Sequence, residues 1–525
     1  MVEVYRPDIT LATPPPVTHR TAEENLGLGY LASTLRTDGK VVEVVDGWLK
    51  GMTTIQLATE ILKNPPKNFL GFSCYRSNME RTIDVANLLR KSGLDVPFIV
   101  GGYGPTFSAE EFLGSGFDIA VRGEAEQTIL EIASHYSFKF PKLEDILGIS
   151  YKNDDNIIHN PARPLKRNID EFPFPTRDTL QFALDRRSAV HILSARGCQA
   201  HCSFCSIVAF QRLSEGPQWR QRSIQNFVDE LEALNKKGAT YFKVIDDSFI
   251  EPPRDENWCS QLANEIEKRG LKVRLRGSIR ADRVTDGVIR ELKRAGFFAF
   301  SCGIENGSDS VLKRMGKSAN LKQNMQALEI FKKYNMYVQA GYILFDHGTT
   351  MEELEENYEF MRRYIWTISK GTFSEMYAAD GTSFTKLLSK QNILKEDVLG
   401  LGNNIYEVQN PQSRIVYEAM RLWHKSHVVI YDMTIDAISA PKALTPEELE
   451  LFHPLSMELK EKDLDFMREV LDMVKKGLSK DSVLEFVYDK VKNSEVWYQN
   501  FEKVVLDTYR KTNLTYDADE NPFIN

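Results

Sequence analysis

The first quarter of the chain alternates short apolar runs with longer amphipathic stretches. Five runs are rich in β-branched and aromatic residues and read DITLAT, KVVEVVD, NFLGFSC, VPFIVGG and FDIAVRG. Nearly continuous apolar strands separated by helices predict a parallel sheet that is covered on both faces. Five such units predict a doubly wound, flavodoxin-like domain over residues 1–138, an α/β fold whose ligands sit beyond the carboxyl ends of the strands.

Residues 139–188 break this alternation. Prolines punctuate the stretch, and LGISYKNDDNIIHN reads as two short strands around a turn at NDDN. We expect an ordered linker that contains a hairpin.

A second strand–helix series occupies residues 189–385. Its six predicted strands are AVHILSAR, ATYFKVIDD, KVRLRGSI, FAFSCGIE, YVQAGYILF and GTFSEMYA. Six strands with helical crossovers fit an incomplete β/α barrel or an open parallel sheet, and the pattern alone does not separate the two. A barrel would place its active site at the carboxyl ends of the strands.

Residues 386–525 lack strand patterns and form amphipathic helical segments. One segment carries Trp423, His424, His427 and Tyr431 at near-helical spacing. Such a stripe could line a substrate pocket, but it is more typical of core packing. The last residues, TYDADENPFIN, are expected to fray.

Composition removes several classes of function. The chain has 525 residues, of which 42% are hydrophobic, so wholesale disorder is excluded. A net charge of −8 argues against nucleic acid as the main partner. No run approaches the roughly 20 apolar residues of a membrane helix. The acidic, proline-containing N-terminus does not resemble a secretory signal, so we expect a cytoplasmic protein.

The clearest chemical signal is a cluster of cysteines. Cys198, Cys202 and Cys205 have the spacing C-x3-C-x2-C in SARGCQAHCSFCSIVAF, directly after the first strand of the second series. Three thiolates on one loop can converge on one metal centre, and a four-iron cluster held by three would keep one iron open. A zinc site would need a fourth ligand, for which only His201 is offered locally. Cys74, Cys259 and Cys302 are expected to be core residues.

This motif, with Phe204 before its last cysteine, resembles the radical S-adenosylmethionine (SAM) enzymes. In that family a [4Fe-4S] cluster binds SAM at its open iron and cleaves it to a 5′-deoxyadenosyl radical. Later strand endings resemble the family's SAM-binding segments. The resemblance implies SAM contacts by Phe204, Asp246, Asp247, Ser278, Arg280 and Glu305.

Two of these assignments have equal or strong alternatives. Asp246 and Asp247 could instead cap a helix or end a strand, and Arg280 could pair with a nearby acid. The fifth strand ending also departs from the family, because Asp346 and His347 stand where many relatives have a proline-containing turn. That departure puts the local adenine contacts in doubt.

A flavodoxin-like domain ahead of such a core resembles the cobalamin-binding radical SAM class. The resemblance covers residues 8 to about 385 and implies cobalamin as a further cofactor. No D-x-H-x-x-G sequence is present to supply a lower axial histidine, and a lone loop residue, His19, is more typical of a solvated surface. The implied cobalamin-binding residues are Ser73, Ser77, Gly101, Gly102, Gly123 and Glu124.

Together these features predict a cobalamin-dependent radical SAM methyltransferase acting on an unactivated carbon of a small-molecule or natural-product substrate. A flavodoxin- or ferredoxin-type donor would supply electrons. One alternative is a non-methylating radical enzyme of the same architecture, for cyclisation, rearrangement or oxidation. Another is a non-catalytic cobalamin or redox sensor. The sequence names no catalytic residue, and it does not identify the substrate.

Overall fold

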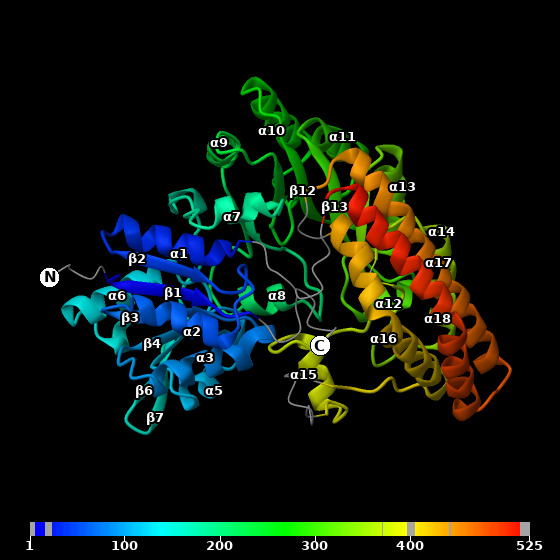
Figure 1. The fold of residues 1–525 in the computed structure, drawn as a ribbon, viewed down its shortest axis with the longest axis horizontal. Coiled ribbons are helices and arrows are strands. Elements are labelled where there is room, and N and C mark those ends of the chain that lie inside the picture. The colour runs from blue at the N-terminus through cyan, green and yellow to red at the C-terminus, as the bar shows by residue number, and fades with distance from the viewer. Residues whose placement is uncertain (1–5, 16–23, 370, 396–404, 440–442, 515–525) are drawn as a thin grey trace.

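A computed structural model describes residues 6–15, 24–369, 371–395, 405–439 and 443–514. Two large sheets and a helical bundle follow one another along the chain (Figure 1). A small antiparallel sheet of β9 (Ala195–Gly197) and β10 (Trp219–Gln221) lies within the second part of the chain. His19 lies outside the described residues.

The first sheet has the strand order β2-β1-β3-β4-β5-β6-β7. Strands β1 to β5 are parallel, which confirms the doubly wound prediction. Helices α1 (Leu26–Thr37) and α6 (Glu126–Phe138) pack on one face, and α2 (Thr54–Lys63), α3 (Met79–Lys91) and α5 (Ala109–Gly114) pack on the other. The parallel strands are β1 Ile9–Thr13, β2 Val42–Asp46, β3 Phe69–Ser73, β4 Phe98–Gly101 and β5 Ile119–Val121.

The predicted hairpin extends this sheet. Its strands β6 (Ile149–Asn153) and β7 (Asn156–His159) are antiparallel, and β6 also pairs with β5. The sequence prediction assigned the hairpin to a linker. In the structure it covers the free edge of β5, because an exposed strand edge is stabilised by a further strand.

The second sheet is a partial parallel barrel with the order β14-β13-β12-β11-β8. Its strands are β8 Val190–Ile192, β11 Tyr241–Val244, β12 Arg274–Arg280, β13 Phe297–Glu305 and β14 Tyr337–Tyr342. Helices α9 (Ile224–Asn235), α10 (Glu256–Lys268), α11 (Asp286–Arg294) and α13 (Leu321–Lys333) share one core on its outer face.

A sixth regular strand over GTFSEMYA was predicted and is not formed. Among the described residues, the region next to β14 makes only isolated parallel bridges, Gln339–Ile368 and Phe345–Glu375. Helix α14 (Met351–Arg363) precedes this region, and α15 (Ser383–Lys390) follows it.

Three long helices close one side of the barrel, at the right of Figure 1. They are α16 (Pro411–Ser439), α17 (Pro446–Lys475) and α18 (Lys480–Lys511). Pro454 lies inside α17, and the helix continues on both sides of it. Trp423, His427 and Tyr431 are buried among these helices, which confirms core packing.

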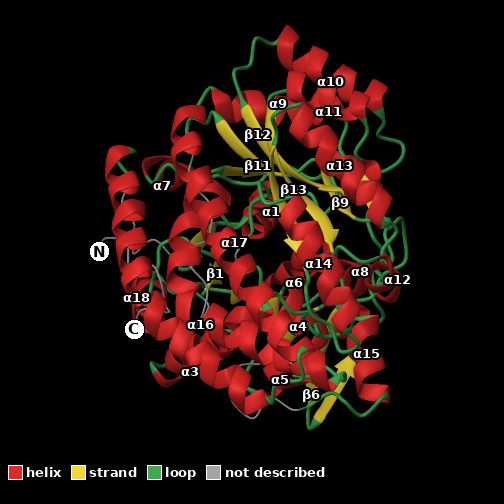
Figure 2. Ribbon diagram, turned by 90° about the vertical axis from the view of Figure 1, so that its right-hand side faces the viewer, coloured by secondary structure: helices red, strands yellow, loops and turns green. Residues whose placement is uncertain are grey.

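Figure 2 shows the helices and strands from the side. None of the helices in the described ranges is long and apolar enough to cross a membrane.

Candidate functional site

The three spaced cysteines lie on the loop between β9 (Ala195–Gly197) and α8 (Ser206–Gln211). Gly197 has φ +89°, and a Cβ there would lie 2.0 Å from the carbonyl oxygen of Gln218, so the position requires glycine. At the centre of the loop, the Ser203 N–H donates to the Met315 carbonyl at 2.8 Å, and the Ser203 carbonyl accepts from the Phe384 N–H at 2.9 Å. Segments distant in sequence therefore fix the loop.

The thiols of this loop are protonated when no metal is bound. Burial raises the pKa of the Cys198 thiol to about 12 and also raises the pKa values of Cys202 and Cys205. None of the chain's cysteines is in a disulfide. Within the described ranges no three His, Cys, Asp or Glu side chains are grouped closely enough to hold a metal ion. The thiols share the loop without converging in this structure.

The donor chemistry nevertheless fits an iron–sulfur cluster. Three free thiols within eight residues are the soft ligands that such clusters take. Burial still raises the pKa of the Cys202 thiol, although positive charge from Lys317 and Arg280 partly opposes that rise. Ligation would release the thiol protons, so binding of a cluster is coupled to pH.

The two acids after β11 support this loop. Asp246 is buried and accepts from the Ser194 N–H at 2.7 Å, and its carboxylate lies 3.6 Å from the Arg254 guanidinium. Asp247 accepts from the Gly197 N–H at 2.9 Å. The residue is exposed to solvent, yet partial loss of hydration raises the pKa of its carboxylate to about 6. Asp246 is thus buried and paired with protein groups, whereas Asp247 is accessible to a ligand.

Ser278 and Arg280 lie on β12, beside the cysteine loop. Ser278 is half-buried, and its carbonyl accepts from the Phe249 N–H. Arg280 donates to Glu251 at 2.9 Å and to Asp282 at 2.6 Å. Arg280 is therefore paired with acids in the structure, and its contact with SAM stays a prediction.

Glu305 ends β13 in a left-handed conformation, with φ +64°. Its carboxylate accepts from the Lys317 ammonium at 2.8 Å, and both side chains are nearly buried. Phe204 contacts an apolar cluster beneath the cysteine loop that includes Met315 and Met376. Asp247 and Glu305 both raise the pKa of the Cys205 thiol, so these candidates surround one loop.

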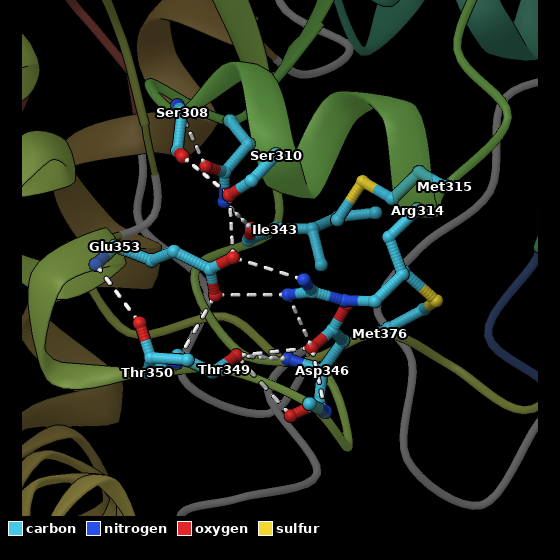
Figure 3. Close-up of polar contacts among 12 residues, drawn as sticks. Ser308, Ser310, Arg314, Met315, Ile343, Asp346, Thr349, Thr350, Glu353 and Met376 are labelled. Atoms are coloured by element: carbon cyan, nitrogen blue, oxygen red, sulfur yellow. Dashed lines mark hydrogen bonds and ion pairs between the residues drawn. The ribbon is translucent and has the colours of Figure 1, made fainter.

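The turn that contains Asp346, after the fifth predicted strand, is held by contacts between Asp346 and Arg314 (Figure 3). Arg314 donates to both carboxylate oxygens of Asp346, at 2.7 and 3.0 Å, and to Glu353 at 2.9 Å. The Gly348 N–H donates to Asp346, and the Asp346 N–H donates to the Thr349 hydroxyl. This network supplies the rigidity that a proline would otherwise give.

A cavity of about 360 Å³ lies between the first sheet and α8, the helix that follows the cysteine loop. Its first wall comes from the carboxyl ends of β3, β4 and β5 and includes Ser73, Gly101, Gly102, Gly123 and Glu124. Its second wall comes from the barrel side and includes Leu193, Arg196, Ile207, Phe210 and Ile245. Five of the six predicted cobalamin residues therefore share one cavity.

The exception is Ser77, which lies in the turn η1 (Arg76–Asn78) and does not line this cavity. Gly102 has φ +111°, and a Cβ there would lie 2.4 Å from the Cys74 carbonyl oxygen, so glycine is required for the turn. Glycine backbone on one wall and apolar side chains on the other fit a large planar ligand such as a corrin.

Ion pairs join the two walls of the cavity. Arg220 donates to both carboxylate oxygens of Glu124, at 2.9 and 2.5 Å, and Arg196 donates to Glu126 at 2.6 Å. Burial opposes ionisation of Glu124, but Arg220 and Arg196 together hold its pKa below the ordinary value. Glu124 is therefore charged and paired across the domain boundary.

Sequence reasoning missed several residues of this site. Glu251, Lys317 and Arg220 contact candidate residues from more than ten positions away, and Arg254 contacts Asp246 from eight positions away. No local motif marks these four residues. Only the folded structure reveals these residues, because each of them pairs with a polar or charged group that the fold buries.

Comparisons with known proteins agree with this geometry. The B12 binding domain family matches residues 18–133, and the radical SAM superfamily matches residues 192–361. An uncharacterised methyltransferase of Pyrococcus horikoshii is 28% identical over 70% of this chain and 79% of its own length. The anaerobic magnesium-protoporphyrin IX monomethyl ester cyclase of Rubrivivax gelatinosus is 28% identical over 74% of this chain and 72% of its own.

A solved structure shares the fold. The cobalamin-dependent SAM radical enzyme OxsB, with aqua-cobalamin and SAM bound, superimposes with a TM-score of 0.74. The match covers 99% of this chain and 83% of that chain, at 21% identity.

The radical SAM domain implies a [4Fe-4S] cluster, SAM and a reductant, and the B12-binding domain implies cobalamin. The chain is a radical SAM enzyme that carries a B12-binding domain ahead of its radical SAM core.

Proposed function

We propose that this enzyme methylates an unactivated carbon of a small-molecule substrate. The observation that carries the proposal is the cavity formed by Gly101 and Gly123 on one side and by Ile207 and Phe210, which follow the cysteine motif, on the other. A methyl donor held there would be next to the helix that follows the cysteine motif, and closeness of the two reacting groups is what such a transfer needs.

Cys198, Cys202 and Cys205 would hold the cluster, which supplies one-electron cleavage of SAM when bound. Asp247 and Glu305 are the proposed polar contacts for SAM, together with Phe204 and Ser278. The proposal leaves Asp246 and Arg280 with supporting roles, because both are paired inside the protein. The apolar walls of the cavity exclude water from reactive intermediates.

Three further assignments belong to the proposal. An external flavodoxin- or ferredoxin-type protein supplies electrons. The compartment is the cytoplasm, where free thiols stay reduced. The domains are 1–138, 139–188, 189–385 and 386–525, and the pairing of β6 with β5 supports moving the first boundary beyond the hairpin.

The test is an anaerobic assay with reconstituted cluster, cobalamin, SAM and a strong reductant, with both SAM fragments quantified by mass spectrometry over a panel of candidate substrates. We expect 5′-deoxyadenosine and S-adenosylhomocysteine to form together. Alanine at Cys198, Cys202 or Cys205 should lower both by more than 100-fold.

The variant Gly101→Val distinguishes the role of cobalamin from that of SAM. It adds a side chain at the cavity wall, where a Cβ makes only ordinary contact with Val121 at 3.5 Å. We expect cobalamin affinity to fall at least tenfold and S-adenosylhomocysteine to disappear, while 5′-deoxyadenosine persists. Gly114→Val is the matched control, because its Cβ meets open space away from the cavity.

A second candidate is a non-methylating radical reaction such as ring formation, favoured by the similarity to a magnesium-protoporphyrin ester cyclase. It predicts 5′-deoxyadenosine without S-adenosylhomocysteine in the presence of the true substrate. An intact cluster that gives neither fragment would contradict both reactions and favour a sensor.

A further inference from the structure

A buried carboxylate lies beside the first cysteine of the motif. Glu251 follows β11 and is fully buried. The Cys198 thiol donates to its Oε1 at 3.5 Å. The same carboxylate accepts from Arg280 Nη1 at 2.9 Å and from Arg283 Nε at 3.2 Å. Glu251 therefore joins the cysteine loop to the end of β12.

The second edge of the Arg280 guanidinium is also fixed. Its Nε and Nη2 donate to the two carboxylate oxygens of Asp282, at 3.0 and 2.6 Å. A guanidinium with forked contacts to two carboxylates has little freedom to move. The four side chains, Glu251, Asp282, Arg280 and Arg283, balance two negative with two positive charges.

This balance changes when Cys198 becomes a ligand. A thiolate has no proton to donate to Glu251, and it adds a negative charge next to that carboxylate. Arg280 is the positive charge beside this sulfur, since its Nη1 donates at 2.9 Å to the same Glu251 oxygen that accepts from the Cys198 thiol. In a water-poor site, charges at this range act strongly on each other.

We propose that Glu251 and Arg280 form a charge-setting pair that fixes the reduction potential of the cluster on Cys198. Arg280 compensates the thiolate, and Glu251 with Asp282 positions Arg280. The inference rests on the proposed ligation by the three cysteines. One electron from the reductant adds negative charge to the cluster, so Arg280 favours reduction and Glu251 opposes it.

The test is a redox titration of the reconstituted full-length protein, followed by electron paramagnetic resonance, without SAM. We expect Arg280→Gln to shift the reduction equilibrium about tenfold toward the oxidised state, which is about 59 mV for a one-electron couple. Glu251→Gln should shift it in the opposite direction. Arg290→Gln is the control, because Arg290 lies on α11 and pairs with Glu256 and Glu291 rather than with any of these four side chains.

The expected result is that Arg280→Gln and Glu251→Gln shift the reduction equilibrium in opposite directions. A purely structural role would not make the direction of the shift depend on the sign of the charge that is lost. Shifts of the same sign, or intact clusters with an unchanged potential, would overturn the proposal. If Arg280 instead holds the SAM carboxylate, Arg280→Gln would weaken SAM binding and leave the SAM-free potential unchanged, which also overturns it.

Arg280→Lys covers the case in which Arg280→Gln assembles no cluster. Arg280→Lys keeps the positive charge, so its reduction equilibrium should stay within twofold of that of the wild type. A tenfold shift for Arg280→Lys would contradict the proposal. Iron and sulfide content tests the three-cysteine ligation separately, because alanine at those cysteines should remove the cluster itself.

Discussion

At the scale of single residues, burial sets the chemistry of several ionisable groups away from the cavity. His427 is stacked on Tyr498 with ring centres 3.7 Å apart and lies against Trp423 in the core of the C-terminal helices. Burial lowers the pKa of its imidazole to about 4. This histidine therefore stays neutral in the fold while it is protonated in the unfolded chain below its ordinary pKa.

The His427 shift predicts a pH dependence of stability. Between pH 6.5 and 4 the unfolded chain binds a proton that the folded chain does not, so the stability contribution is lost as pH falls. We expect wild type to lose about 2 kcal/mol more than His427→Phe between pH 7 and pH 5, measured by urea unfolding of the helical signal.

His427→Phe keeps the aromatic stack, so the comparison isolates the charge. His159→Gln is the control, because His159 lies on the exposed β7 edge. Parallel pH profiles for wild type and His427→Phe would contradict the prediction.

At the scale of elements, the turn after β14 depends on one arginine. Asp346 is 1% exposed and Glu353 is 6% exposed, and Arg314 pairs with both. A buried acid that loses its partner is destabilising by several kcal/mol, whereas an exposed pair contributes little. The turn in Figure 3 is therefore held by charge rather than by a fixed backbone angle.

Arg314→Leu should lower the free energy of unfolding by about 3 kcal/mol or more, because two carboxylates are left in the protein without their partner. Arg314→Lys should recover only part of the loss, since lysine cannot make the forked contact. Thermal unfolding measures the effect. Lys333→Gln, in an exposed pair with Asp286, is the control and should leave stability nearly unchanged.

At the scale of the whole molecule, contacts between the two sheet domains shape the cofactor cavity. Arg220 is almost fully buried and crosses from the barrel side to Glu124 of the first domain. Elsewhere the Tyr103 hydroxyl donates to the Asp380 carbonyl at 2.8 Å. The cavity thus depends on how the domains dock as well as on each sheet.

Arg220→Leu should weaken binding of aquacobalamin about tenfold or more, because Glu124 would lose its forked partner and the two walls would separate. Absorbance titration with aquacobalamin measures the affinity. Arg90→Leu removes a surface pair with Asp118 inside the first domain and should leave the affinity unchanged. Equal affinities for both variants would show that docking does not control the cavity.

Local patterns predicted the parts of the molecule that local physics decides. The inner parallel strands β1, β3, β4 and β5 are mostly apolar, because they are buried on both faces, and this could be read directly. The edge strand β2 carries Glu43 and is only partly buried. Cys198, Cys202 and Cys205 were identifiable because one loop carries all three. The five cobalamin candidates that share the cavity follow consecutive parallel strands, whose carboxyl ends meet at one sheet edge.

Only the tertiary structure decided which charged side chains pair. It also decided whether segments with a weak strand pattern join a sheet. Glu251 contacts Cys198 and Arg280 across 53 and 29 positions, a relation that no sequence period encodes. GTFSEMYA has strand composition but makes only isolated bridges, and the predicted linker hairpin joined the first sheet. Sequence determined the elements and the ligand loop because those depend on neighbouring residues, whereas pairing depends on which partners the folded chain brings into a low-dielectric interior.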